Sequence, residues 1–195
     1  MTYLKLTCLL LIYSVVFGSG GFDNGTATGK GKFQIDLTFN PFDKYEFGQT
    51  YSIMSYGITE NFDVHGYISR HNGPFYTWYG GFFYQFHKSH KIDLATAIGI
   101  RKRFDDTWTH IFSPQILYAL NITEKIKIGG SLVNVYNYTT KNNYGLTYDI
   151  ALGYTIQFKD SILESISINV GGFHPVTWSP DTYFLPTYSL DFKFK

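Results

Sequence analysis

The chain has 195 residues, enough for one domain, and its 16 Lys and Arg against 15 Asp and Glu leave no basic surplus for a nucleic-acid partner. Charged residues make up 16% and aromatic residues 19%, a composition that excludes a disordered tail and a charged coiled coil. The single Cys excludes a disulfide framework and a multi-cysteine zinc site.

The first twenty residues have the layout of a secretory signal peptide. One early cation, Lys5, precedes an apolar core from Leu6 to Phe17, and small residues follow. This core is too short to span a membrane as a helix, so we expect residues 1–20 to be removed on export. Residues 21–195 are then expected to form a single domain. A buried N-terminal helix is the alternative.

Beyond this segment, apolar and polar residues alternate with a period of two, as in a strand with two different faces. In the segment 144–158, Tyr144 and Ile150 belong to a large apolar face, and Asp149 and Thr155 belong to a small polar one. Ten segments alternate in this way, namely 31–40, 48–58, 61–70, 75–87, 91–104, 110–122, 125–138, 144–158, 164–174 and 183–194. We therefore predict an all-β protein, an antiparallel up-and-down barrel of about ten strands, with eight as the alternative.

The direction of the apolar face distinguishes a soluble barrel from a membrane barrel. A lipocalin-like barrel points its large apolar residues inward, whereas a transmembrane β-barrel points them toward lipid. Here the polar faces are rich in Gly, Ala, Ser and Thr and poor in Lys and Glu, as suits a narrow interior. Aromatic residues gather near segment ends, as in the aromatic girdles of membrane barrels. These features favour the transmembrane barrel, with a soluble lipocalin-like binder as the alternative.

In this pattern the chain resembles the small outer-membrane β-barrel proteins of Gram-negative bacteria. Its last segment, from Thr187 to Phe194, is similar to the terminal signature read by the barrel-assembly machinery, although Lys195 follows the final aromatic residue. The resemblance implies a location in the bacterial outer membrane. It also implies contact with the lipid bilayer and lipopolysaccharide, and an encounter with the assembly machinery during biogenesis. No cofactor, metal or nucleic acid is expected.

An even number of strands with both termini in the periplasm assigns the connections to the two sides of the membrane. The connections near 59–60, 88–89, 123–124 and 160–161 are expected on the periplasmic side. The other connections are expected outside, and the three tryptophans would lie at that outer end: Trp78, Trp108 and Trp178.

Charged and histidine side chains on the polar faces are expected to point into the lumen. The candidates for a pore lining or a plug are Asp36, Asp63, His65, His87, Asp93, Arg101, Arg103, Asp149, Asp191 and Lys193, and Arg70 is expected to point inward as well. They could form an interlocking network that plugs a narrow barrel. The alternative is that they line a polar path, which Arg101 and Arg103 would bias toward anions.

Three functions follow from these expectations. The first is a narrow porin-like channel or a mainly structural membrane component. The second is an adhesion or surface-binding barrel that acts through the loops around Trp108 and Trp178. The third is a membrane-embedded hydrolase that uses Asp63 and His65, which share one face of one strand. No nucleophile motif accompanies this pair, so catalysis is the weakest of the three hypotheses.

Overall fold

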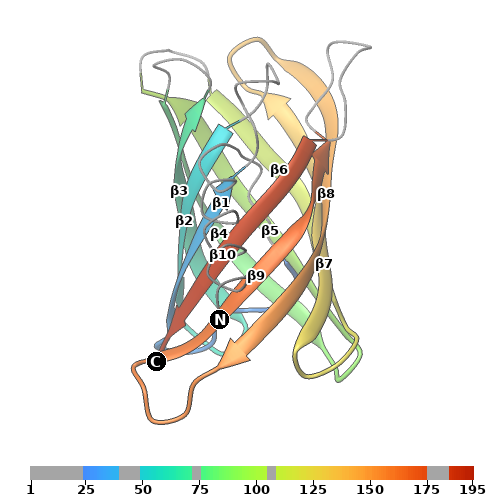
Figure 1. The fold of residues 1–195 in the computed structure, drawn as a ribbon. Coiled ribbons are helices and arrows are strands. Elements are labelled where there is room, and N and C mark those ends of the chain that lie inside the picture. The colour runs from blue at the N-terminus through green and yellow to red at the C-terminus, as the bar shows by residue number, and fades with distance from the viewer. Residues whose placement is uncertain (1–23, 40–48, 72–75, 105–108, 175–184) are drawn as a thin grey trace, which may run out of the picture.

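The computed structural model describes residues 24–39, 49–71, 76–104, 109–174 and 185–195. Within them, ten antiparallel strands form a closed barrel in which each strand pairs with its neighbours in the chain (Figure 1). The strands are β1 (Phe33–Phe39), β2 (Gln49–Gly57), β3 (Phe62–His71), β4 (Tyr76–Lys88), β5 (Ile92–Arg103), β6 (Thr109–Asn121), β7 (Ile126–Asn137), β8 (Asn142–Gln157), β9 (Leu163–His174) and β10 (Leu185–Phe194). No helix in the described ranges has the length and apolar character needed to cross a membrane.

The predicted all-β barrel of ten strands is confirmed, and each predicted segment overlaps one observed strand. The barrel closes where β1 pairs with β10, from Phe33 opposite Phe194 to Phe39 opposite Tyr188. Short turns at 58–61, 89–91, 122–125 and 158–162 lie at the end of the barrel where β10 finishes, which we call the turn end. The opposite end is the loop end.

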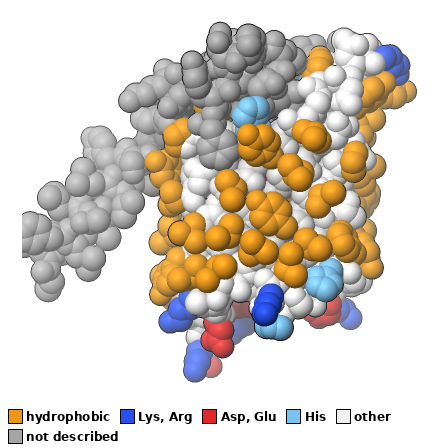
Figure 2. Space-filling model, turned by 90° about the vertical axis from the view of Figure 1, so that its right-hand side faces the viewer, with side chains coloured by type: hydrophobic (Ala, Val, Ile, Leu, Met, Phe, Trp, Pro, Cys, Tyr) orange, Lys and Arg blue, Asp and Glu red, His pale blue; other side chains and the backbone are white. Residues whose placement is uncertain are grey.

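Large apolar side chains cover the outside of the barrel. In β8, Ile150 and Leu152 are 45% and 56% exposed, whereas Asp149 and Ala151, which alternate with them, are 4% and 5% exposed. Figure 2 shows the resulting apolar belt on the barrel wall, with charged side chains gathered below it at the turn end. Soluble monomers rarely expose continuous apolar patches of this extent. The belt therefore suits a hydrocarbon environment, as the membrane reading of the sequence predicted.

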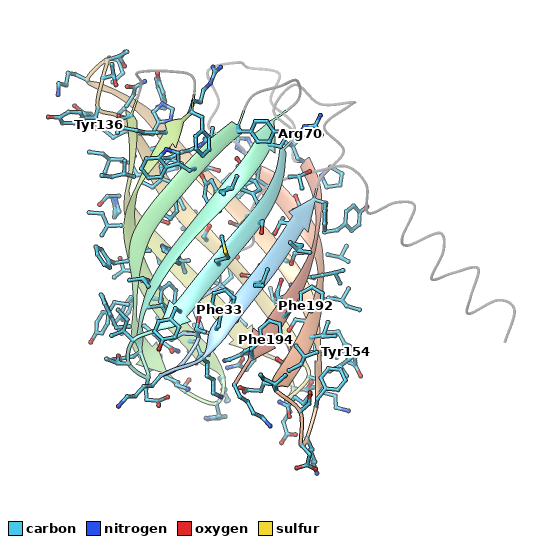
Figure 3. The ribbon with its side chains drawn as sticks, turned by 90° about the vertical axis from the view of Figure 1, so that its left-hand side faces the viewer. Phe33, Arg70, Tyr136, Tyr154, Phe192 and Phe194 are labelled. Carbon is cyan, nitrogen blue, oxygen red and sulfur yellow. The ribbon has the colours of Figure 1, made fainter. Side chains whose placement is uncertain are left out.

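Aromatic side chains border the apolar belt at both ends (Figure 3). Phe33, Phe192, Phe194 and Tyr154 lie toward the turn end, and Tyr136 lies toward the loop end. The Phe33 and Phe194 rings, 6.4 Å apart between centroids, also pack across the seam between β1 and β10. This arrangement matches the aromatic girdles that membrane barrels place at the two lipid–water interfaces.

One irregularity in β8 reverses the predicted direction of a side chain. The register between β7 and β8 shifts between Val135 and Tyr136, and Gly145 has a positive φ of 99°. Glycine reaches this conformation without steric cost, and Tyr144 is the extra residue that has no register partner on β7. Tyr144 consequently points inward, where its ring lies 5.3 Å from the His110 ring. Its predicted place on the outer apolar face is therefore wrong.

A charge introduced into the middle of the apolar belt is expected to destabilise the barrel. Ile150→Arg should cost about 2–4 kcal/mol of the free energy of unfolding, because the guanidinium would enter hydrocarbon. The measurement is urea unfolding in phospholipid vesicles. Ile162→Arg, in the exposed turn at 158–162, is the matched control and should cost about 0–1 kcal/mol. Equal losses in the two variants would contradict a lipid-facing belt.

Candidate functional site

The lumen of the barrel is the candidate functional site, and its two halves differ. On the wall formed by β2 to β6, aromatic side chains fill the bore, with Tyr79 of β4 at their centre. The Tyr79 ring stacks on Tyr67 at 5.0 Å between centroids and lies 5.6 Å from the Phe112 ring. Its Oη accepts a hydrogen bond of 2.9 Å from Gln115 Nε2 and lies 3.1 Å from His65 Nε2. Side chains from two strands besides its own, β3 and β6, thus hold Tyr79 across the lumen.

Glycine makes the room that the Tyr79 ring occupies. A Cβ atom at Gly99 of β5 would lie 2.2 Å from the ring, and one at Gly81 would lie 2.5 Å from Tyr79 Oη. Any larger residue at Gly99 would therefore displace the ring. The aromatic filling of the lumen depends on glycines beside Tyr79 in its own strand β4 and in the adjacent strand β5.

The opposite half of the lumen, along β7 to β10 and β1, is lined by small and polar residues and contains a cavity of about 210 Å³. Its small lining residues include Gly129, Ala151, Gly153, Ser165 and Ser167, and its charged ones are Glu124, Lys127, Glu164, Asp191 and Lys193. Mixed charges and small side chains give this space a polar surface. It is large enough for several water molecules or a small polar solute.

The segment Asn24–Gly31, here called the N-terminal strap, lies inside the barrel at the turn end. Its backbone N–H at Thr28 donates to Asp63 Oδ2 at 2.7 Å, and the N–H of Ala27 donates to Gln85 Oε1 at 3.1 Å. The alternation of the sequence did not indicate this segment, because eight residues of Gly, Thr, Ala, Asn and Lys have no apolar face. The available signal was an unassigned run of small residues between residues 1–20 and the first predicted strand.

Most of the predicted lumen residues lie on the inner face of their strands. The predicted residues that face the lumen are Asp36, Asp63, His65, Asp93, Arg101, Arg103, Asp149, Asp191 and Lys193. Arg101 and Arg103 are half-buried near the loop end of β5, opposite Tyr79 and Thr77 of β4. Lys193 and Asp191 line the cavity near the turn end.

Two predicted inward positions are wrong. His87 is exposed, because the register between β4 and β5 shifts between Gln85 and His87 and places His87 opposite the outward-facing Leu94. Arg70 is exposed at the loop end, next in the strand to the buried Ser69 and therefore on the opposite face (Figure 3). Of the three tryptophans, Trp78 lies on the outer surface of β4, and Trp108 and Trp178 lie outside the described residues.

Carboxylates in the lumen accept hydrogen bonds from neighbouring strands. Asp191 accepts from Asn169 Nδ2 at 2.7 Å and from Ser189 Oγ at 2.8 Å. Asp149 of β8 accepts from Ser131 Oγ of β7, so the bond crosses the strand pair. Such bonds compensate the loss of hydration that a charge suffers in a narrow interior. They also stiffen the wall around the cavity.

The pair that suggested a hydrolase has structural partners in the lumen. Asp63 binds the backbone of Thr28 in the N-terminal strap, and His65 lies against Tyr79 and Phe83, with ring centroids 5.2 and 6.2 Å apart. Both side chains thereby join the filled half of the bore. Their contacts connect the strap to the aromatic cluster above it.

An apolar belt between aromatic girdles and a polar lumen define the class of protein, a β-barrel of the outer-membrane type. Among solved structures, the fold is similar to KdgM porin, with a TM-score of 0.52 and 9% sequence identity over 84% of this chain and 98% of that one. A second similar structure is KdgM porin in complex with disordered oligogalacturonate, with a TM-score of 0.45, 9% identity and the same coverage. No family model and no curated protein sequence matches the chain. At this identity the likeness shows the fold.

Displacing Tyr79 from the lumen is expected to destabilise the barrel. Gly99→Val should cost about 1–3 kcal/mol, since its side chain would enter the space of the Tyr79 ring. Tyr79→Ala in the same chain should recover part of this loss, because the clash is gone. Urea unfolding of the wild type, both single variants and the double variant measures the coupling. Additive losses would contradict the contact.

Proposed function

We propose that the protein is an outer-membrane barrel that forms a narrow, porin-like channel for small polar solutes. The observation that carries the proposal is the inside-out distribution of side chains, with exposed Ile150 and Leu152 outside and a polar cavity of about 210 Å³ inside. The fold likeness to KdgM porin supports it. The filled half of the lumen supports a small conductance rather than a wide pore.

The proposed orientation places the turn end in the periplasm and the loop end outside the cell. Short turns at one end and longer connections at the other are the usual arrangement in this class. In this scheme residues 1–20 are a leader removed on export, and the outer rim faces lipopolysaccharide. The outward aromatic residues Phe192 and Phe194 of β10 are the proposed recognition element for the barrel-assembly machinery.

The proposed path runs past Arg101 and Arg103 near the loop end and leaves along the small-residue wall of β8 and β9. The two guanidiniums, placed on one face of β5, raise the local concentration of anions in a low-dielectric bore. Near the turn end, Lys193 and Asp191 present one positive and one negative charge to the solute. We therefore propose a modest preference for anions, with no strong exclusion of cations.

Removal of the two arginines is expected to lower the anion preference. In planar bilayers, Arg101→Ala with Arg103→Ala should shift the reversal potential under a KCl gradient toward cation selectivity, because two positive charges leave the bore. Lys102→Ala is the matched control, since Lys102 lies between them on the opposite face of β5, across from Trp78. An equal shift in the control would contradict a luminal role for the arginines. Absence of conductance both in the wild type and in a chain that lacks residues 24–28 of the N-terminal strap would contradict the channel and favour a structural or adhesive barrel.

Filling the cavity is expected to reduce the conductance. Ala151→Phe introduces a large ring into the small-residue wall of β8 and should lower the single-channel conductance by about half or more, because a narrow bore is sensitive to its cross-section. Ile150→Phe, the adjacent residue on the outer face, adds the same ring toward lipid and should leave the conductance unchanged. Unchanged conductance in Ala151→Phe would place the path elsewhere.

A further inference from the structure

The N-terminal strap crosses the turn end of the barrel from β2 to β7. It enters beside β2, where Gly31 N–H donates to the Gly57 carbonyl oxygen at 2.8 Å and Lys30 forms a parallel bridge with Gly57. Farther along, Thr26 Oγ1 donates to Asp93 Oδ2 of β5 at 2.8 Å. At its far end, Asn24 reaches Gly129 of β7, where an added Cβ would lie 2.9 Å from Asn24 Cβ. The strap thus contacts the wall over more than half of its circumference.

The fit between strap and wall is close. A Cβ atom at Gly25 would lie 2.5 Å from the Asp93 carbonyl oxygen and 2.8 Å from Tyr118 Cα, both of which belong to the barrel backbone. Ala27 is buried in an apolar cluster with Phe83, Ala95, Ala97 and Leu117. Backbone hydrogen bonds to Asp63 and Gln85 flank this cluster. The wall therefore forms a groove that is matched to an extended segment of small residues.

The strap also separates the cavity from the aromatic half of the lumen. Asn24, Thr26 and Ala27 supply one side of the cavity, and the strands β7 to β10 and β1 supply the others. Lys127 Nζ of β7 lies on the cavity side and donates to Thr26 Oγ1 at 3.5 Å. Without the strap, the cavity would continue to the inner faces of β3, β4 and β5. The strap thus limits the width of the lumen at this end.

Two glycines flank the point at which the strap leaves the wall. Gly29 and Gly31 have φ angles of 89° and 75°, and Lys30 between them is exposed. Positive φ values at two positions in three residues give the chain a sharp bend that other residues rarely adopt. This bend directs the strap from the rim into the lumen.

We propose that the N-terminal strap is a tethered plug that narrows the turn end of the channel, and that its release widens the path on the β3 to β5 side. This inference rests on the proposed channel function. The strap is held by hydrogen bonds and small-residue packing, and it supplies none of the ten strands that close the barrel.

Cysteine labelling measures strap occupancy independently of conduction. In a Cys8→Ser background, Ala27→Cys should react with a charged methanethiosulfonate reagent at least tenfold more slowly than the exposed Lys30→Cys. Adding Gly25→Leu should expel the strap, because its side chain would meet the backbone of β5 and β6, and should raise the reactivity of Ala27→Cys to within about threefold of Lys30→Cys. Lys30→Leu in the Ala27→Cys protein is the matched control and should leave protection intact.

Conductance of the same proteins tests the plug. Gly25→Leu should raise the single-channel conductance about twofold or more over the wild type, and Lys30→Leu should leave it unchanged. Deletion of 24–28 provides a second released variant if Gly25→Leu does not fold, as judged by its far-ultraviolet circular dichroism. A silent wild type with a conducting Gly25→Leu would also support the plug.

The outcomes separate the plug from the channel. Rapid labelling of Ala27→Cys in the parent protein would overturn the plug. A conducting wild type whose conductance does not change in either released variant would overturn the plug and leave the channel standing. Silence of the wild type and of both released variants would overturn the channel and the plug together.

Discussion

In the hydrocarbon of a membrane, no water is available to hydrogen-bond a backbone N–H or C=O group that lacks a protein partner. This constraint shapes the barrel. The barrel meets it by pairing β1 with β10, so that no strand of the ten is an edge. Closure then separates the side chains into an outer set, which must suit lipid, and an inner set in a narrow space. Large apolar residues occupy the first set, and small, polar and aromatic residues occupy the second.

The inward-pointing side chains are bulky in one half of the lumen and small in the other, so they do not fill the bore evenly. Tyr79 and its aromatic neighbours occupy one half, with Gly99 making room for the ring. The other half has small residues such as Ala151 and Gly153 and keeps a polar cavity. The N-terminal strap lies between these two halves. A solute path in this barrel is therefore set by side-chain volume as much as by charge.

The period-two alternation of apolar and polar residues predicted the fold, because successive residues of a strand point alternately to the outer and the inner face of the barrel. Residues such as Asp149 and Ile150 differ so much in polarity that their directions follow from the sequence alone. Two of the errors arose where the alternation is interrupted. The inward turn of Tyr144 depends on the conformation of Gly145, and the exposure of His87 depends on a register shift opposite β5. The strap has no alternation, and its place depends on tertiary contacts with Asp63, Gln85 and Asp93.

The seam between β1 and β10 has a consequence for biosynthesis. Phe33 and Phe194, which meet there, are separated by almost the whole described chain, so the last ladder of hydrogen bonds joins the earliest-made strand to the latest-made one. A nascent chain emerging N-terminus first cannot complete the cylinder until β10 has been synthesised, and contacts so distant in sequence form slowly. A chain that has not yet gained β10 has two unpaired edge strands. Their free backbone N–H and C=O groups make it prone to associate with other chains.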